Sequence, residues 1–518
     1  MNTSIDQEFA VITELVRAHA RSAPQRPALV HGDSVLDYAA LDAQMDRVAW
    51  ALQRDGLVPG DSIAICAGMS VPYAVVFLGA LRAGVVVAPL APGSGSASLQ
   101  RMVQDAQARR IFVDDAGALA LGLPAEGGDV PRIALDGGAA GQPLARWWGP
   151  TGAVPQPVAV QPSWPFNIIY SSGTTGEPKG IVQPHGMRWA HVRRGAAYAY
   201  GPDMVSLVST PLYSNTTLVV FFPTLAAGGT LVLLPKFDVA AFLALAEARR
   251  VTHAMLVPVQ YQRLMAWPQF DAFDLSAFRM KFCTSAPFPA ALKAEVLRRW
   301  PGGLVEYYGM TEGGGTCILE AHRYPDKLHT VGRPAAGHDI RLIDAQGRQL
   351  PPGETGEVVG RSAGMMTGYH GQPERTREAE WFDPQGLRFI RTGDIGRFDA
   401  DGFLTLLDRR KDMLISGGFN VYPSDLEAVL REHPAVLEAA VVGVPSERWG
   451  ETPVAFVVLR PGHPEPAEEL RAWANARLGK VQRLSRVVLV DELPRSSIGK
   501  VLKRELRERL EADPTAGQ

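Results

Sequence analysis

The stretch "IIYSSGTTGEPKGIVQPHG", from Ile168 to Gly186, joins a short buried strand to a loop rich in glycine, serine and threonine. The preceding residues "FNIIY" read as the strand because they are mostly apolar, with β-branched and aromatic side chains. Backbone N–H groups left accessible by glycine, together with hydroxyl groups, form a nest for anions. Lys179 adds a point charge that suits phosphate oxygens. The stretch therefore predicts a phosphate site beside a buried strand.

The alternative to a phosphate site is that this loop is an ordinary solvated turn. If it does bind phosphate, two common phosphate-binding patterns do not fit it. A Walker A loop needs glycine, lysine and then a hydroxyl residue, whereas here Lys179 precedes Gly180 and no hydroxyl follows. The G-x-G-x-x-G fingerprint is also absent, which argues against a Rossmann dehydrogenase.

Length and composition limit the class of protein. The chain has 518 residues, of which 46% are hydrophobic, and this predicts two or three globular domains. Lysine plus arginine number 52 against 54 aspartates and glutamates, a formal net charge of -2. A net charge this small gives no long-range electrostatic attraction to nucleic acid, so we expect small-molecule partners.

Cysteine usage and the N-terminus predict a cytoplasmic protein. Cys66, Cys283 and Cys317 are far apart and lack the pairing of a zinc site or a disulfide framework. The N-terminal residues carry Asp6 and Glu8 where a secretory signal would be basic.

Two apolar segments resemble membrane spans, one starting at Val71 and one at Thr217. The first contains Arg82, and the second contains Pro223 and a pair of glycines near its middle. Each is therefore expected to be a buried helix followed by a buried strand, with no integral membrane segment.

The pattern along the chain predicts an α/β fold. Helical and strand patterns alternate from Tyr38 to Leu90, which favours a layered domain with a largely parallel sheet. After Gly332, short alternating strands separated by D-A-Q-G, P-G-E-T-G and D-A-D-G turns predict antiparallel β-structure. From Met413 onward a compact αβ mixture predicts a separate small domain.

Five motifs occur in order: "SSGTTGEPKG" from Ser171, "YYGMTE" from Tyr307, "RTGD" from Arg391, "DRRKDMLISGGFNVYPSDLE" from Asp408 and "PRSSIGK" from Pro494. With these motifs the chain resembles the adenylate-forming superfamily of acyl-CoA synthetases, adenylation domains and luciferases, from about Leu36 to Glu508. The resemblance implies a large N-terminal domain of layered αβ subdomains with a β-rich subdomain (1–410). It also implies a small mobile α+β C-terminal domain (411–518), with a hinge at Lys411.

The resemblance implies a reaction in two halves. A carboxylate attacks the α-phosphate of magnesium-bound ATP to give acyl adenylate and pyrophosphate, and a thiol then displaces AMP. Glu312 is expected to hold Mg2+, which suits a metal that prefers one carboxylate plus phosphate oxygens. The implied ATP-binding residues are Ser171, Ser172, Gly173, Thr174, Thr175, Gly176, Lys179, Ser285, Ala286, Pro287, Tyr308, Gly309, Thr311, Asp394, Arg409 and Lys500.

Within that set, the resemblance gives individual roles. Tyr308 is expected to stack on adenine, Thr311 to contact phosphate and Asp394 to bind the ribose hydroxyls. Lys500 matches the catalytic lysine of the first half-reaction, with Thr311 and Glu312 as further catalytic residues. Gly417 and Gly418 would leave room for the pantetheine arm of coenzyme A, because glycine permits close backbone approach.

The acyl substrate is expected to be uncharged and hydrophobic. Amino-acid-activating relatives place an aspartate where this chain has Tyr213 and Ser214, so a substrate ammonium group would be left unpaired here. Three glycines after Glu312 would widen the pocket. The predicted acyl-binding residues are Tyr213, Ser214, Val257, Tyr261, Gly313 and Gly314. Aromatic, alicyclic and aliphatic acids all remain open.

Coenzyme A is the expected thiol, because no carrier domain follows the helix after Lys500. Two alternatives remain: an adenylating enzyme that loads a separate carrier protein, and a non-catalytic nucleotide-binding relative, in which Lys500 or Glu312 would be lost. Both residues are present. The sequence leaves the oligomeric state undetermined, with a homodimer as one possibility.

Overall fold

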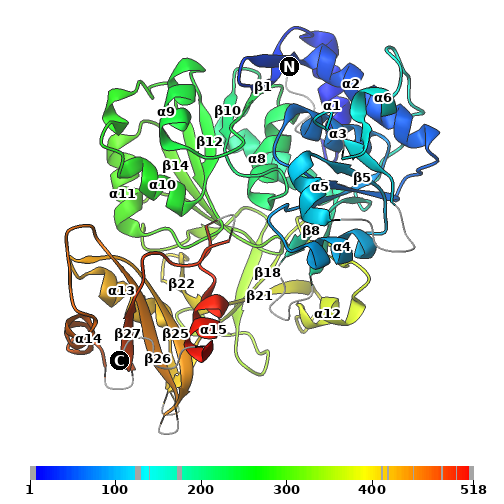
Figure 1. Cartoon of the computed structure of the whole chain (residues 1–518). Coiled ribbons are helices and arrows are strands. Elements are labelled where there is room, and N and C mark those ends of the chain that lie inside the picture. Colours follow the sequence, from blue (N-terminus) through cyan, green and yellow to red (C-terminus); the bar gives the residue numbers. More distant parts are fainter. Residues whose placement is uncertain are drawn as a thin grey trace. The chain divides into compact units, whose positions relative to one another are not determined.

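A computed structural model describes residues 7–122, 130–138, 140–171, 178–409, 412–416, 419–446, 449–479, 482–496 and 499–512. The chain divides into two compact units: unit 1 is Met1–Ile340 with Gly360–Ile390, and unit 2 is Arg341–Val359 with Arg391–Gln518. Both units mix helices and strands, which confirms the predicted α/β class with a larger N-terminal and a smaller C-terminal part (Figure 1). The domain boundary at 410/411 stays a prediction, since Lys411 lies outside the described residues and residues 391–409 group with unit 2.

The first sheet of unit 1 contains the two strands between which the glycine-rich loop lies in the sequence. Its strands run in the order β19 (Gly368–Tyr369), β9 (Lys179–Pro184), β8 (Pro165–Ser171), β4 (Val86–Leu90), β3 (Ser62–Cys66), β5 (Ala108–Val113), β6 (Arg132–Ala134) and β7 (Gln142–Pro143). β8 is parallel to β4 and antiparallel to β9, so β8 and β9 form a hairpin whose register pairs Ser171 with Lys179. Its accompanying helices are α4 (Ser96–Asp105), α5 (Asp115–Leu121) and α6 (Leu144–Trp147).

The second sheet of unit 1 has a parallel centre with antiparallel strands at both edges. Its order is β16 (Arg333–Pro334), β15 (Cys317–Glu320), β14 (Gly303–Tyr308), β13 (Met280–Cys283), β12 (His253–Leu256), β10 (Val205–Val208), β11 (Thr230–Leu233), β1 (Pro27–His31) and β2 (Ser34–Asp37). Helices α9 (Val239–Ala248), α10 (Pro258–Met265) and α11 (Ala290–Arg299) follow β11, β12 and β13, and α7 (His185–Gly195) precedes β10. The carboxyl ends of parallel strands share one edge, where α/β proteins bind ligands.

The two membrane-like segments are buried helices followed by buried strands, as predicted. They form α3 (Val71–Arg82) with β4, and α8 (Asn215–Ala226) with β11. Phe77 of α3, Phe166 of β8 and Phe222 of α8 pack together, with ring centroids 4.8 to 6.2 Å apart. In this interior Arg82 pairs with Asp42 and Asp46, at 2.5 and 2.9 Å, so its buried charge has partners.

Helix α2 (Tyr38–Arg54) carries these two aspartates and packs on α3 and on α1 (Ile12–Ser22). Asp37 caps it by accepting a hydrogen bond from the Ala40 amide at 2.8 Å. Its apolar residues fall at three- and four-residue spacing, so one face enters the core that α3 and α8 share.

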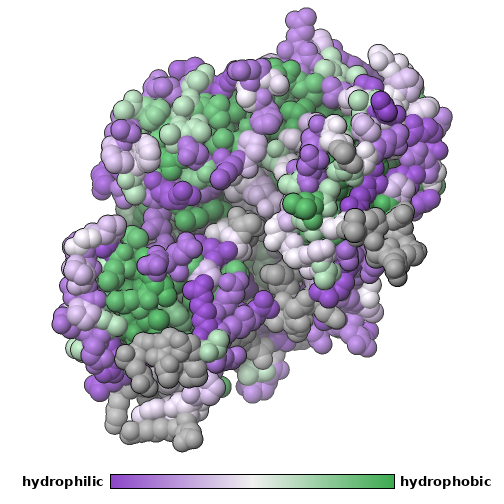
Figure 2. Space-filling view, viewed as in Figure 1, coloured by the Kyte–Doolittle hydropathy of each residue, from purple (hydrophilic) through white to green (hydrophobic). Residues whose placement is uncertain are grey.

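None of the helices in the described part of the chain is long and apolar enough to cross a membrane. Among the coloured residues of Figure 2, hydrophilic and apolar side chains alternate in small areas over the visible surface of unit 1. The strongly apolar stretches of α3 and α8 are explained by burial in the protein core.

The predicted antiparallel β-structure after Gly332 is also present. One sheet runs β17 (Asp339–Ile343), β18 (Thr355–Arg361), β21 (Arg388–Phe398) and β20 (Glu380–Phe382), and β22 (Leu404–Arg409) pairs with β21. β21 is antiparallel to both β20 and β22. Helix α12 (Pro373–Glu378) precedes β20.

Unit 2 contains a further sheet with helices on both faces. Its order is β24 (Phe419–Val421), β23 (Leu414–Ser416), β26 (Gly450–Leu459) and β25 (Val436–Ser446), with β27 (Arg486–Leu489) beside β26. Alternate residues of the long pair β25–β26 enter two cores, since Val441 and Val457 join one and Val442 and Phe456 the other. Helices α13 (Pro423–Arg431) and α14 (Ala467–Asn475) complete the first core, and α15 (Lys503–Ala512) completes the second.

Candidate active site

In unit 1, the motif residues lie at the carboxyl ends of the strands. Residues 309–312 follow β14, residues 284–287 follow β13, and residues 209–214 follow β10. The Thr284 hydroxyl donates to the Tyr307 carbonyl at 2.9 Å, which ties two of these loops together. The fold thus gathers "CTSAP", "PLYSN" and "YYGMTE" at one sheet edge, where a ligand is expected.

Helix α11 fixes the strand that presents Tyr308. Lys293 of α11 and Glu306 of β14 are both buried and form an ion pair, and Lys293 also donates to the Leu328 carbonyl at 2.8 Å. Burial raises the pKa of Glu306, and the Lys293 charge opposes that rise. Tyr307 stacks on Phe282 in the core, so alternation along the strand turns Tyr308 to the opposite face, where it is partly exposed.

Lys179, Tyr369 and Glu312 come together at the base of the glycine-rich loop. The Lys179 ammonium lies 5.1 Å from the centroid of the Tyr369 ring, and the Tyr369 hydroxyl donates to Glu312 Oε1 at 2.9 Å. The predicted residues Ser172, Gly173, Thr174, Thr175 and Gly176 lie outside the described residues, as does the side chain of Ser171. The structure therefore brings together the cation and the carboxylate that the sequence singled out.

Tyr369 is a residue that sequence reasoning missed. It lies on β19, which pairs with β9 so that Tyr369 is opposite Ile181. This pairing carries the ring to the lysine that follows the loop. The available signal was the segment "TGYHG" from Thr367, in which an aromatic residue stands between glycines at a strand end.

Ser285 has a strained backbone and a close polar neighbour. Its φ is +84°, in the left-handed region that favours glycine. Its hydroxyl lies 2.6 Å from that of Thr216 on α8. Of the next two residues, Ala286 is partly exposed and Pro287 is exposed, so this loop is accessible at the sheet edge.

The predicted acyl-binding residues differ in accessibility. Ser214 is buried and caps α8, accepting from the Thr216 amide at 3.3 Å, while Tyr213 is partly exposed. Val257 is buried, and the fully buried Tyr261 donates to the Phe282 carbonyl at 2.9 Å. These two contribute to the wall behind the carboxyl ends of β12 and β13.

Gly313 and Gly314 are explained by close backbone packing. Their φ angles are +75° and +85°, and a Cβ would lie 2.0 Å from the Gly364 carbonyl oxygen and 2.7 Å from that of Gly360, respectively. The structure thus accounts for these glycines without a wider acyl pocket, and their role in acyl binding stays a prediction.

In unit 2, Asp394 and Arg409 lie opposite each other on β21 and β22. Arg409 Nε is 3.2 Å from Asp394 Oδ1, and Asp394 is largely buried. The carboxylate that is expected to bind ribose and the guanidinium that is expected to meet the nucleotide therefore form one pair. Lys411, Gly417 and Gly418 lie outside the described residues.

Lys500 sits in a tight turn. Gly499 has a φ of +78°, the Lys500 carbonyl accepts from the Ser496 amide at 2.9 Å, and Arg495 pairs with Val501 in a single bridge. Arg495 also bonds the Gly499 carbonyl and Glu438, both at 2.7 Å. The turn that presents Lys500 is thus anchored to the sheet of unit 2.

A second polar cluster supports the strand before the loop. The Tyr170 hydroxyl donates to Asp105 Oδ2 at 2.6 Å, and His370 Nδ1 lies 3.7 Å from the same oxygen. The neighbouring Asp105 carboxylate raises the pKa of His370 above 6.5, against the opposing effect of burial. The His370 amide also donates to the Gly180 carbonyl at 2.7 Å.

We expect the His370–Asp105 pair to stabilise the protein more at pH 6 than at pH 8.5. A raised native pKa makes the contribution complete below pH 6.5 and lost as the pH rises through the native value. His370→Asn should lower Tm by about 1–2 °C more at pH 6 than at pH 8.5, since a partly exposed pair contributes less than about 1 kcal/mol. Thermal unfolding of both proteins at the two pH values measures this, and an equal or reversed difference would contradict it.

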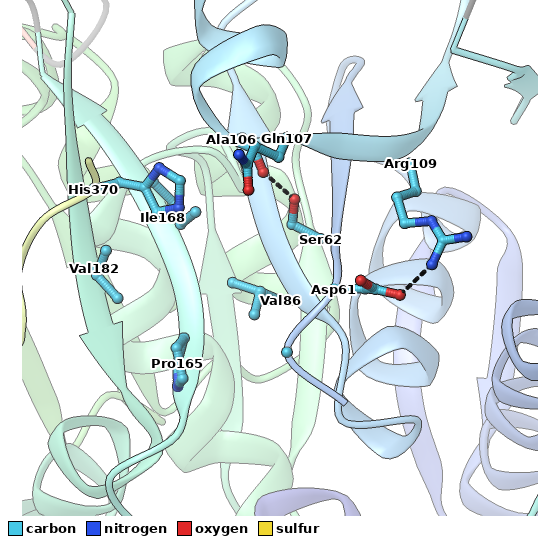
Figure 3. Close-up of a pocket in the computed structure, with 11 residues that line it drawn as sticks. Asp61, Ser62, Val86, Ala106, Gln107, Arg109, Pro165, Ile168, Val182 and His370 are labelled. Carbon is cyan, nitrogen blue, oxygen red and sulfur yellow. Dashed lines mark hydrogen bonds and ion pairs between the residues drawn. The ribbon is translucent and has the colours of Figure 1, made fainter. Parts of the chain in front are cut away.

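A cavity of about 280 Å3 lies in the first sheet of unit 1, at the amino-terminal ends of several of its strands. It is lined by the first residues of β3, β4 and β8, namely Ser62, Val86 and Pro165, with His370 at one side (Figure 3). Arg109 and Asp61 form an ion pair of 2.6 Å at its rim. Because these are amino-terminal strand ends, this cavity is separate from the carboxyl-end site.

In the described part of the chain, no group of three or more histidine, cysteine, aspartate or glutamate side chains could hold a metal by itself. Glu312 Oε1 accepts from Tyr369, and Oε2 has no partner among the described residues. The described residues therefore leave one carboxylate oxygen for a cation completed by ligand oxygens.

The chain matches two family models. The model described as AMP-binding enzyme matches residues 16–370, and the model described as AMP-binding enzyme C-terminal domain matches residues 425–500.

Relatives and solved structures match over nearly the whole chain. A feruloyl-CoA synthase from Amycolatopsis sp is 35% identical, covering 95% of this chain and 97% of the relative. ScoC, a fatty acid–acyl-carrier-protein ligase from Streptomyces coeruleorubidus, is 32% identical, covering 98% of each. The structure of ATP-bound MatB from Rhodopseudomonas palustris has a TM-score of 0.85 at 30% identity, covering 96% of this chain and 99% of that one.

Proposed function

The chain belongs to the AMP-binding enzyme family, and from that premise we propose that it is an ATP-dependent carboxylate–CoA ligase for hydrophobic acids. In the first half-reaction, a carboxylate oxygen attacks the α-phosphorus of ATP, giving acyl adenylate and pyrophosphate. In the second, the thiol sulfur of coenzyme A attacks the acyl carbon, AMP leaves, and the thiol proton is released. The enzyme is thus an AMP-forming acid–thiol ligase.

One observation carries this proposal above the others. The feruloyl-CoA synthase is 35% identical over 95% of this chain, so the similarity spans both units. Glu312 and Lys500, whose loss would mark a non-catalytic relative, are both present in the chain. The proposal therefore favours an active enzyme over a nucleotide-binding relative without activity.

Residues of unit 1 would hold the nucleotide. Lys179 and the hydroxyl groups of the loop at 171–176 would bind the β- and γ-phosphates, since positioning and charge neutralisation carry most of the catalysis in such transfers. Tyr308 would stack on adenine beside residues 285–287 and Gly309. In unit 2, Asp394 would accept hydrogen bonds from the ribose, oriented by its ion pair with Arg409.

Glu312 would hold Mg2+, with Thr311 contacting phosphate. Bound magnesium would neutralise phosphate charge as pyrophosphate departs. The support from the described residues is that none of them partners Oε2 of Glu312, while the Tyr369 hydroxyl donates to Oε1 at 2.9 Å and orients the carboxylate.

Lys500 would act in the first half-reaction, contacting the acyl carboxylate and the α-phosphate as charge develops. We propose that the C-terminal domain starts at residue 411, that Lys411 is its hinge, and that Gly417 and Gly418 admit the pantetheine arm. The two units support a two-domain arrangement.

The acid is proposed to be aromatic, alicyclic or aliphatic. Position 213–214 offers a tyrosine and a serine in place of a carboxylate, which leaves a substrate ammonium without a partner. A cytoplasmic location belongs to the same proposal, supported by three free and buried cysteines.

A panel of carboxylic acids, scored for pyrophosphate release with and without coenzyme A, tests this function. We expect turnover with hydrophobic acids, little with α-amino acids, and sustained release only when coenzyme A is present. A panel in which no acid releases pyrophosphate from ATP, or in which amino acids are preferred, would contradict it.

Loading of a carrier protein is the second candidate, favoured by the 32% identity to ScoC over 98% of both chains. It predicts pyrophosphate release that coenzyme A does not accelerate and that a phosphopantetheinylated carrier protein does.

A further inference from the structure

Arg188, on the first turns of α7, is a buried cation in an unusual setting. Arg188 is 1% exposed, and its guanidinium bonds only neutral amide oxygens among the residues that the structure describes. Its partners are the side-chain oxygens of Asn167, Gln183 and Asn215, here called the amide cage. Arg188 Nε and Nη2 donate to Asn167 Oδ1 at 3.1 and 3.0 Å, Nη1 donates to Asn215 Oδ1 at 2.9 Å, and Nη2 donates to Gln183 Oε1.

The amide cage satisfies hydrogen bonds but supplies no negative charge. Asn167 and Gln183 are fully buried and face each other across the β8–β9 hairpin. The rings of Phe166 and Phe222 lie 5.7 and 6.0 Å from the guanidinium carbon. Burial lowers the pKa of Arg188 to about 9, which still leaves it charged at neutral pH. A buried, unpaired charge is costly, so a compensating anion is expected nearby.

The amide cage leads directly to the candidate active site. Gln183 Nε2 donates to the Thr311 carbonyl at 2.6 Å, and Thr311 precedes Glu312. Asn215 opens α8 immediately after Ser214. The hairpin that holds Asn167 and Gln183 also ends in the glycine-rich loop. Arg188 is thus two hydrogen bonds from the phosphate-contacting segment, in an interior that screens charge weakly.

We infer that Arg188 is a positioning residue whose buried charge is balanced by the phosphates of the bound nucleotide, acting through Gln183 and Thr311 without touching them. This inference rests on the proposed ATP site. It predicts that Arg188 contributes to binding affinity in proportion to the negative charge of the ligand. The contribution is largest for ATP, smaller for AMP, and close to zero for adenosine.

Binding of ATP, AMP and adenosine to the full chain, measured by calorimetry, tests the inference. Arg188→Met keeps the length and removes the charge, and it should weaken ATP binding about tenfold and AMP binding less, while adenosine affinity stays within about twofold. Arg188→Lys keeps a charge and should retain the wild-type ratio of ATP to adenosine affinity. Equal weakening of all three ligands, or unchanged ATP affinity in Arg188→Met, would overturn the inference.

Asn215→Asp provides an independent test if Arg188→Met does not fold. The new carboxylate would supply the missing counter-ion at the 2.9 Å contact with Arg188. We expect Tm to rise while ATP affinity falls about tenfold relative to adenosine, a combination that a purely structural arginine would not produce. Unchanged ATP affinity in this variant would also overturn the inference. A wild-type protein that binds ATP no better than adenosine would instead refute the proposed ATP site.

Discussion

Replacing Lys500 by alanine is expected to slow acyl-adenylate formation at least about a hundredfold, the scale on which one preorganised charge stabilises a transition state. Thioester formation from supplied acyl adenylate should change less than about threefold, because that step no longer needs a cation between carboxylate and α-phosphate. The turn that presents Lys500 is held by Gly499, Ser496 and Arg495, so removing the side chain should leave its backbone in place.

Single-turnover assays of the two half-reactions measure this separation. Lys236→Ala is the matched control, since it removes one exposed lysine outside every motif and should leave both rates unchanged. Equal loss of both half-reactions in Lys500→Ala would contradict the assignment of Lys500 to the first step alone.

Replacing Glu312 by alanine is expected to lower kcat/KM for ATP about a hundredfold and to raise the magnesium concentration needed for half-maximal rate. The carboxylate has one oxygen fixed by Tyr369 and one without a partner among the described residues, which is the arrangement that a metal ligand requires. Rates measured over a magnesium series at constant ATP give both quantities.

Tyr369→Phe is the matched control for Glu312→Ala. It removes one hydrogen bond and keeps the carboxylate, so we expect a loss of about tenfold or less with a small shift in magnesium dependence. An unchanged magnesium dependence in Glu312→Ala would take Glu312 out of the metal site.

The features that the sequence predicted correctly depend on local pattern. The apolar segments at Val71 and Thr217 each carry an interruption that a membrane span would avoid, and this predicts a helix followed by a strand. Alternation and turn residues predict the short strands after Gly332, and β21 and β22 are antiparallel as expected. Such signals act over a few residues, so no tertiary information was needed.

The features that the sequence did not reveal depend on pairing between distant segments. Tyr369 reaches Glu312 only because β19 pairs with β9. The amide cage exists because the hairpin register places Asn167 opposite Gln183 and because α8 begins beside α7. The close packing of Gly313 and Gly314 against the carbonyl groups of Gly364 and Gly360 is a further feature of this kind, and their role in acyl binding stays a prediction.

The most direct test of the central claim is isotope transfer from the acid to AMP. The experiment uses an acid that the enzyme accepts as a substrate, with both carboxylate oxygens labelled with 18O. The proposed attack on the α-phosphorus predicts one 18O atom in each AMP and none in pyrophosphate. Label in inorganic phosphate, together with ADP as the nucleotide product, would show an acyl phosphate route and would contradict the account.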